Sequence, residues 1–264
     1  IREMKQLRNL TLVVVALALS HTALAWNSFG HEAIAYVAEQ HLSAEAKSEV
    51  RRYLCHTLPF YSSWMDHWRA VPPFHPTNAW HGFSATADGN VNWEKGNGKA
   101  MGQVVDIYKS MSKGNYKNLP DSLVRHNLLI LVHALPDMHC PVHTHIEGVK
   151  TIWKCKLNGK EWVKFHPIYD KIPMMIYGKK ADPDAVAAKI DNIKKSEIKR
   201  VVKGDIVDWA CDAAEVSSLI YNINPIGTYD LDPKTIEKSQ PIVECQLRNA
   251  GYRLAAKLNE YFDN

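Results

Sequence analysis

The chain has 264 residues, of which 46% are hydrophobic, and its 32 Lys and Arg against 28 Asp and Glu give a net charge of +4. This length and composition suit a folded domain with a sizeable core. The small charge, with no basic tail or Lys/Arg block, excludes a nucleic-acid binder that depends on a broad electrostatic surface. A polyanion would have to be recognised locally, by a metal or by a few side chains.

Residues 1–25 have the pattern of a cleaved signal peptide. The basic residues Lys5 and Arg8 precede an apolar stretch that is too short to span a bilayer, and small residues of a cleavage site end at Ala25. An uncleaved signal anchor is the alternative. We expect an exported protein, periplasmic or secreted, whose residues 26–264 form one domain without stable membrane association.

Five cysteines in an exported chain allow up to two disulfide bonds with one thiol left over. The sequence does not determine the pairing, and a bond between Cys140 and Cys155 is one candidate. The cysteines are Cys55, Cys140, Cys155, Cys211 and Cys245.

Apolar residues at helical spacing predict a mainly α-helical chain. Ser43 is placed as the N-cap of the second helix. Residues 75–97 contain Pro, Gly, Asn and Asp and show little hydrophobic periodicity. We therefore expect an irregular connection over the surface there. The predicted helices cover residues 34–42, 44–54, 61–69, 98–111, 120–135, 184–194, 199–221 and 235–261.

One β-hairpin is predicted at 151–165. Two runs of β-type residues flank Asn158-Gly159, the favoured two-residue hairpin turn, and the second run leads directly into His166. The expected fold class is therefore all-α with one small hairpin.

Two histidine and aspartate pairs have metal-ligand spacing. His133 and Asp137 are four residues apart, so on a helix they project from one face, and His143 follows soon after. His166 and Asp170 repeat the same spacing. Imidazole and carboxylate are ligands that Zn²⁺ takes. For the first pair alone, a core histidine bonded to its aspartate is an equally good interpretation.

Further candidate ligands lie elsewhere in the chain. Cleavage after residue 25 would expose the α-amine of Trp26, which can chelate a metal together with its carbonyl oxygen. His31, Asp66 and His81 are the other candidates. Each is weak alone, because a single Asp is most often a helix cap and a single His is most often solvated, but their number makes coincidence improbable.

In order along the chain, these segments resemble the S1/P1 nuclease family of zinc-dependent single-strand nucleases and 3′-nucleotidases. The resemblance implies a mainly α-helical fold shared with bacterial zinc phospholipase C. The segments that carry it are Trp26–His31, Trp64–Arg69, His81, Leu131–His143, His166–Asp170 and Gln246–Leu254.

The resemblance also implies three zinc ions and a ligand set. Asp137 would bridge two of the ions, and Trp26 would bind through its amine and carbonyl. The implied ligands are Asp66, His81, His133 and Asp137 for the first zinc, Asp137, His31 and Trp26 for the second, and His143, His166 and Asp170 for the third.

By the same resemblance the chain is expected to be a monomeric hydrolase of ester bonds in single-stranded DNA, RNA and 3′-nucleotides. A hydroxide bridging two zinc ions would attack the phosphorus, and the third ion would stabilise the leaving oxygen. Asp66 would also orient the attacking water. Arg69 would contact the scissile phosphate, and a surface arginine after a short helix is its alternative.

Three positions depart from the family pattern. The aromatic residue that stacks on the base is displaced by one position to Phe83, which is the expected substrate-binding residue, with a core phenylalanine as the alternative. Pro136 replaces a Gly, so a kink is expected that still presents Asp137. Cys140 replaces a Gln.

Two rival functions are open. A zinc phospholipase C would use the same metal cage, although that class usually has Glu where this chain has Asp170 and carries apolar membrane-contacting loops that the sequence lacks. A non-catalytic zinc-stabilised binding protein would have no use for Trp26 as a ligand or for Arg69.

Overall fold

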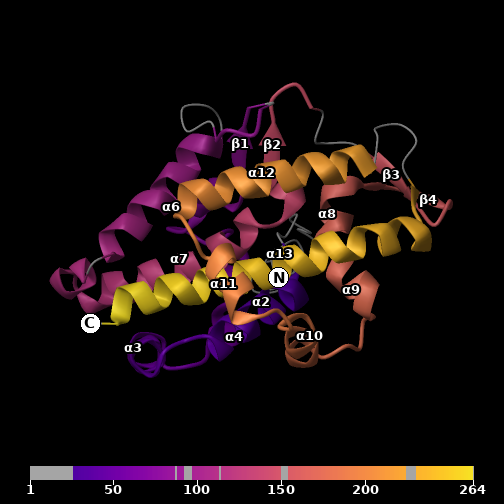
Figure 1. Ribbon diagram of the computed structural model, residues 1–264. Helices are drawn as coiled ribbons and strands as arrows, with labels where there is room; N and C mark the ends of the chain where they lie inside the picture. Colours follow the sequence, from indigo (N-terminus) through magenta and orange to yellow (C-terminus); the bar gives the residue numbers. More distant parts are fainter. Residues whose placement is uncertain are drawn as a thin grey trace, which may run out of the picture.

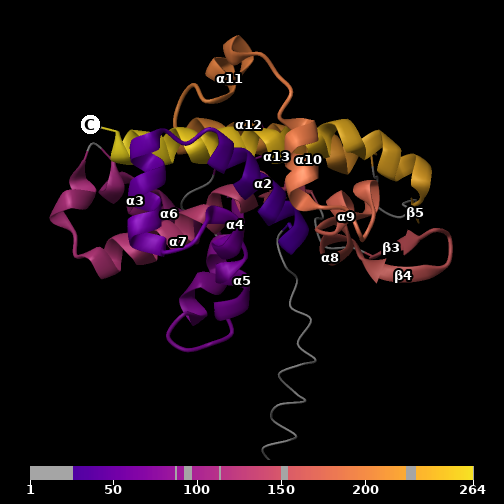
Figure 2. The same ribbon diagram turned by 90° about the horizontal axis from the view of Figure 1, so that it is seen from below.

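The long C-terminal helix α13 (Pro233–Phe262) spans the molecule, and the computed structural model arranges the other helices around it (Figure 1). Helices α2, α3 and α7 pack against it. Seen from below, α5, α8 and the β3–β4 hairpin lie on the side of the molecule away from α12 (Figure 2). The described residues are 26–86, 88–91, 97–112, 114–149, 154–223 and 230–263, so the predicted signal peptide lies outside them.

Helices dominate the described chain, as the sequence predicts. Short 3-10 helices are labelled η. The helices are α2 (Ser28–Gln40), α3 (Ala44–Leu54), α4 (Leu58–Tyr61), α5 (Trp64–Trp68), η1 (His75–His81), α6 (Asn97–Met111), η2 (Asn115–Asn118), α7 (Asp121–Met138), η3 (Pro141–His143), α8 (Phe165–Tyr169), α9 (Ile172–Tyr177), α10 (Pro183–Ile190), α11 (Lys195–Val201), α12 (Ile206–Ile223) and α13 (Pro233–Phe262).

In the described residues, five short strands form two small sheets. Within the described residues the predicted hairpin is confirmed: β3 (Lys154–Leu157) pairs antiparallel with β4 (Glu161–Lys164), and the predicted residues 151–153 lie outside the described part. Asn158 and Gly159 between them have φ of 52° and 68°, as the expected turn requires. The parallel pair of β1 (Phe83–Ala85) with β2 (Thr144–Ile146) was not predicted, and neither was β5 (Asp230–Leu231) beside β3.

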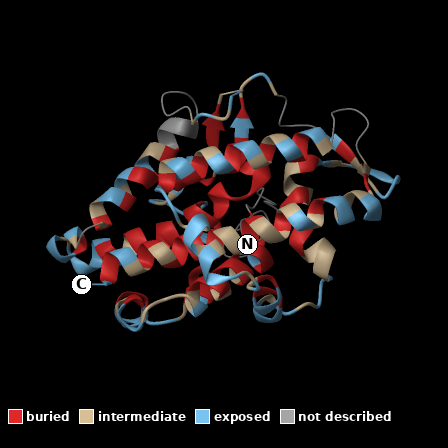
Figure 3. Cartoon of the chain, viewed as in Figure 1, coloured by how far each residue is buried: buried red, intermediate tan, exposed pale blue. Residues whose placement is uncertain are grey.

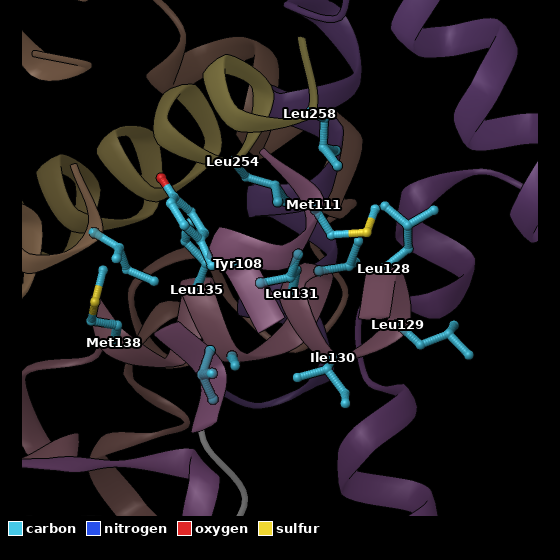
Figure 4. Packing of buried hydrophobic residues seen from close by; sticks show 14 of the residues in the cluster. Tyr108, Met111, Leu128, Leu129, Ile130, Leu131, Leu135, Met138, Leu254 and Leu258 are labelled. Atoms are coloured by element: carbon cyan, nitrogen blue, oxygen red, sulfur yellow. The ribbon is translucent and has the colours of Figure 1, made fainter. Parts of the chain in front are cut away.

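The apolar stripes of the sequence become buried helix faces (Figure 3). Ser43 caps α3 by accepting a hydrogen bond from the Ala46 N–H, as predicted. Leu254 and Leu258 of α13 lie beside α7 residues such as Leu131 (Figure 4). The predicted stripe of α13 is buried along its length, at Val243, Leu247, Ala250, Leu254 and Leu258.

Two buried clusters of apolar side chains form the core. One contains Met65 of α5 and much of α7, and the other contains Trp26 together with Phe165 and Tyr169 of α8. The predicted metal ligands belong to segments from both clusters. The candidate site therefore lies where the two clusters meet.

Several sequence predictions were wrong in detail. The segment 75–97, predicted as irregular, contains η1 and β1. The helix predicted at 199–221 is two helices, because Gly204 adopts a φ of +89° that ends regular helix between α11 and α12. Helix α7 continues through Pro136 to Met138, past its predicted end.

The predicted disulfide bonds are not formed. All five cysteines, which lie within the described residues, are free thiols, so the candidate pair of Cys140 with Cys155 is wrong. In the part of the chain that the structure describes, no helix has the length and apolar character needed to cross a bilayer.

Gly251 lets α13 approach α2, and this contact predicts the effect of a substitution. A Cβ added there would lie 2.6 Å from Val37 Cβ and 3.0 Å from the Ile34 carbonyl oxygen. We expect Gly251→Ala to lower the free energy of unfolding by about 1–3 kcal/mol, as overpacking does. Urea denaturation measures the change.

Gly102 of α6 is the matched control, because a Cβ there would meet no atom within 4 Å. Gly102→Ala should raise stability by roughly 0.5–1 kcal/mol, since alanine is the better helix former. Equal midpoints for Gly251→Ala and the unsubstituted protein would contradict the close packing of α2 on α13.

Candidate metal centre

Helix α7 brings the first predicted pair together. His133 and Asp137 are buried, with 3.2 Å between His133 Nε2 and Asp137 Oδ2. His133 Nδ1 donates a hydrogen bond of 2.7 Å to the carbonyl oxygen of Ser62. This bond fixes the ring so that Nε2 faces the site, which is how metal-binding histidines are usually oriented.

Two more histidines meet the same carboxylate. His31 Nε2 of α2 lies 3.1 Å from Asp137 Oδ1, and His81 Nδ1 of η1 lies 2.8 Å from Asp137 Oδ2. The rings of His31 and His133 stack with centroids 4.1 Å apart. Asp137 therefore presents its two oxygens to different imidazoles, an arrangement that suits a carboxylate between two cations.

Asp66 and Arg69 reach the site from α5 and its C-cap. Asp66 has carboxylate oxygens 3.8 Å from His81 Nδ1 and from His133 Nε2. Arg69 Nη1 lies 3.7 Å from Asp66 Oδ1, and both side chains are buried. The alternative of a surface arginine is therefore wrong.

The third predicted group also converges. His166 Nε2 lies 3.0 Å from His143 Nε2 and 3.5 Å from Asp170 Oδ2, and His143 Nε2 lies 3.6 Å from Asp170 Oδ1. His143 Nδ1 donates a hydrogen bond to the His81 carbonyl oxygen, so this group is joined to the first. The side chain of His166 is 32% exposed, whereas those of His143 and Asp170 are buried.

Trp26 is held beside these residues. Its side chain is fully buried and lies over Gly30, where an added Cβ would come within 3.0 Å of Trp26 Cβ. The next peptide is tied to the third group, because the Asn27 N–H donates a 2.9 Å hydrogen bond to the Asp170 carbonyl oxygen. The backbone of the first residues described is thus anchored at the site.

Unsatisfied buried atoms make the side chains suitable for cations. Asp66 Oδ1, His81 Nε2 and Asp170 Oδ2 are buried and have no hydrogen-bond partner. Such atoms are costly unless a ligand satisfies them. Burial, together with the charges of Asp137 and Asp66, raises the pKa of Asp170 well above its usual value, and a bound cation would relieve that repulsion.

The histidines of the third group are kept neutral, as metal ligands must be. Burial and the neighbouring His166 lower the pKa of His143 to about 3. Burial lowers the pKa of His166 itself to about 4. Burial also lowers the pKa of His31, with a further contribution from His133. Groups of three with metal-compatible spacing are His31, His133 and Asp137; Asp66, His81 and His133; and Cys140, His143 and Asp170.

Phe83, the predicted substrate-binding residue, is fully buried in the core cluster of α6 and α7. The prediction of a stacking platform is corrected, because no face of this ring is exposed to a base. Trp68, in contrast, is 44% exposed and stacks against Trp64.

Gly82 explains why no aromatic residue directly follows His81. A Cβ at this position would lie 2.7 Å from the carbonyl oxygen of His143. Only glycine allows the backbone after η1 to approach η3 this closely. The approach brings His81 and His143 into one site.

Sequence reasoning missed the residues that hold the end of α7. Gln246 Nε2 of α13 donates a 3.1 Å hydrogen bond to the His139 carbonyl oxygen, and Arg253 Nη1 lies 3.0 Å from His139 Nε2. Burial and Arg253 lower the pKa of His139 to about 3, so its ring is neutral and can accept this bond. The sequence offered one signal for this role: the polar residues Gln246 and Arg253 lie within the apolar stripe of α13.

Comparisons with known proteins point to one family. The profile of the S1/P1 nuclease family matches residues 26–263. Nuclease P1 of Penicillium citrinum is 26% identical over 269 residues, which cover 89% of this chain and 97% of that protein. Nuclease S1 of Aspergillus oryzae is 26% identical, covering 96% and 97%. Endonuclease 4 of Arabidopsis thaliana is 25% identical, covering 96% and 94%.

The close approach at Gly82 predicts a loss of metal binding when it is prevented. In Gly82→Ala the added methyl group should push η3 away and displace His143 from its partners. We expect lower metal content and a loss of stability of about 1–3 kcal/mol. Elemental analysis of the purified variant and urea denaturation measure the two effects.

Gly102→Ala again serves as the control and should keep the full metal content, since an added Cβ there contacts nothing. If Gly82→Ala keeps both its metal and its stability, the backbone contact does not organise the site.

Proposed function

The chain belongs to the S1/P1 nuclease family, and on that premise we propose that it hydrolyses single-stranded DNA, RNA and 3′-nucleotides at three zinc ions. The membership makes it a hydrolase of nucleic-acid ester bonds. One observation carries the finer proposal: histidines and aspartates from α2, α5, η1, α7, η3 and α8 converge, all but His166 are buried, and several of their ligand atoms have no hydrogen-bond partner.

We assign the ligands by their contacts. Asp137 would contribute to two ions, because its two oxygens face different imidazoles. His166 belongs to the third group, because its Nε2 lies 3.0 Å from His143 Nε2 and 3.5 Å from Asp170 Oδ2. By these contacts Asp66, His81, His133 and Asp137 would hold one ion, Asp137 and His31 a second, and His143, His166 and Asp170 a third. The amine and carbonyl of Trp26 are added to the second ion from the family resemblance alone.

Zinc, when bound, supplies positive charge for the phosphate oxygens and makes water acidic enough to ionise near neutral pH. The protein supplies the orientation. Arg69 is a buried cation beside Asp66, so it is well placed to bind the phosphate as charge develops on it. Asp66 has a buried acceptor oxygen without a hydrogen-bond partner, and this oxygen would orient the attacking water.

We further propose that residues 1–25 are a cleaved signal peptide and that 26–264 act as an exported, monomeric domain. The match of the family profile starts at residue 26, which supports a boundary there. Cleavage at that point would produce the free amine of Trp26 that the ligand assignment needs.

The substrates are tested by assaying the purified chain that begins at Trp26 on single-stranded DNA, RNA, 3′-AMP and phosphatidylcholine. We expect hydrolysis of the first three, loss of activity after chelation and recovery when zinc is restored. Hydrolysis of the lipid alone would indicate a phospholipase C and overturn the proposal. Full activity after complete removal of metal would overturn the role of zinc.

Arg69 provides a second prediction. Arg69→Ala should lower kcat by about 100-fold, because a charge that stabilises the transition state contributes on that scale. Arg69→Lys should recover part of the rate, since lysine keeps the charge without the planar guanidinium. Steady-state kinetics on single-stranded DNA separate kcat from KM.

Arg51→Ala is the control, because Arg51 is an exposed arginine on α3. It should leave kcat and KM unchanged. If Arg69→Ala affects only KM, Arg69 binds substrate and transition state equally, and the catalytic assignment is wrong.

A further inference from the structure

An exposed aromatic ring lies next to the candidate metal centre in the chain. Trp68 is the last residue of α5 and is exposed, whereas the next residue, Arg69, is buried against Asp66. Figure 2 shows α5 and the loop after it projecting from the body of the molecule on the side where α8 lies. Because Phe83 is buried, a base of the substrate needs a different ring to stack on.

Other aromatic side chains hold the ring of Trp68 in place. It stacks on Trp64 with centroids 6.3 Å apart, and it meets Phe74 at 5.9 Å with an angle of 72° between the rings. Trp64 and Phe74 in turn contact His126 of α7, at centroid distances of 6.1 and 6.2 Å. Since these neighbours already restrict the indole, little side-chain freedom would be lost when a base stacks on its exposed surface.

Helix α7 sets the distance between this aromatic cluster and the metal ligands. His126 and His133 are seven residues apart, which is about two helical turns, so both lie on the same face of α7. At the helical rise per residue, their separation along the axis is about 10 Å. A stacked strand rises about 3.4 Å per nucleotide. The cluster is therefore roughly three nucleotides away from a phosphate bound at the metals.

The side chains around Trp68 suit a nucleic-acid strand. Residues 67–81 contain no Asp or Glu, so no carboxylate of this segment repels a polyanion. Of its large hydrophobic side chains, only Trp68 and Val71 are exposed. A membrane surface binds through a much larger exposed apolar area. One aromatic ring is enough for one base, because every base has a π-face.

We propose that Trp68 binds the single-stranded substrate by stacking on a base roughly three nucleotides from the cleaved phosphate. The inference rests on the proposed function, because it needs a strand held at the metals and Arg69. Bases in a duplex are already paired and stacked on each other, so this contact favours single strands. It also makes affinity depend on chain length, since a 3′-nucleotide is too short to reach Trp68 from the metals.

Steady-state kinetics of the protein beginning at Trp26 test the contact. The substrates are 3′-AMP and a single-stranded thymidine oligonucleotide of about ten nucleotides, which is longer than the span to Trp68. Trp68→Ala should raise the KM for the oligonucleotide about ten-fold relative to the KM for 3′-AMP, as the loss of one stacked base does. Trp68→Phe should recover most of this affinity and Trp68→Leu should not, because only an aromatic ring offers a π-face to the base.

Leu219→Ala is the matched control, because Leu219 is an exposed hydrophobic residue of α12, on the other side of the molecule (Figure 2). It should keep the ratio of the two KM values. An unchanged ratio in Trp68→Ala, or full recovery in Trp68→Leu, would overturn the inference. Equal losses on both substrates would also overturn it, since they would show that Trp68 supports the metal centre.

Binding to phosphatidylcholine vesicles separates a lipid surface from a nucleic acid. We expect none in the unsubstituted protein. Vesicle binding that is lost in Trp68→Ala would assign the ring to a membrane and overturn the inference. Failure of the proposed function differs from all these results, because the unsubstituted protein would then hydrolyse neither 3′-AMP nor the oligonucleotide.

Discussion

The buried carboxylate of Asp137 is the interaction on which the rest of the site depends. Three imidazoles, from His31, His81 and His133, lie within 3.2 Å of its two oxygens, and they come from three helices far apart in the chain. An ionised carboxylate away from water is stable only with such partners or with cations. Helices α2, α7 and η1 must therefore pack so that these side chains meet, and the core on both sides of α7 is arranged accordingly.

The scaffold holds this arrangement from the side away from the metal ligands. Gln246 and Arg253 of α13 bind His139, where α7 ends and the segment leading to η3 begins. On the other side, β1 pairs with β2 just after His81 and His143, so a two-stranded parallel sheet fixes the spacing of two candidate ligands that are distant in sequence. The candidate site thus depends on contacts made by residues outside the proposed ligand set.

Sequence reasoning succeeded where the signal was local. The spacing of His133 and Asp137 predicted a shared helix face, Asn158-Gly159 predicted its turn, and Ser43 predicted its cap. It failed where a residue's surroundings came from distant segments. Phe83 has the aromatic ring that a stacking platform needs, but the pairing of β1 with β2 and the packing of α6 bury it. Five cysteines in a chain expected to be exported suggested disulfides, yet all five are free thiols.

The sequence by itself determined the helical class, the identity of the candidate ligands and their order along the chain, because helical periodicity and ligand chemistry are properties of short segments. Only the tertiary structure decided which of them share a site, that Arg69 is buried against Asp66, and that the thiol of Cys140 faces Asp170. These features depend on contacts between segments that are far apart in the sequence. The number of residues between two such segments does not indicate how close they lie in the fold. They follow from the packing of α2, α7, α8 and α13 as one core.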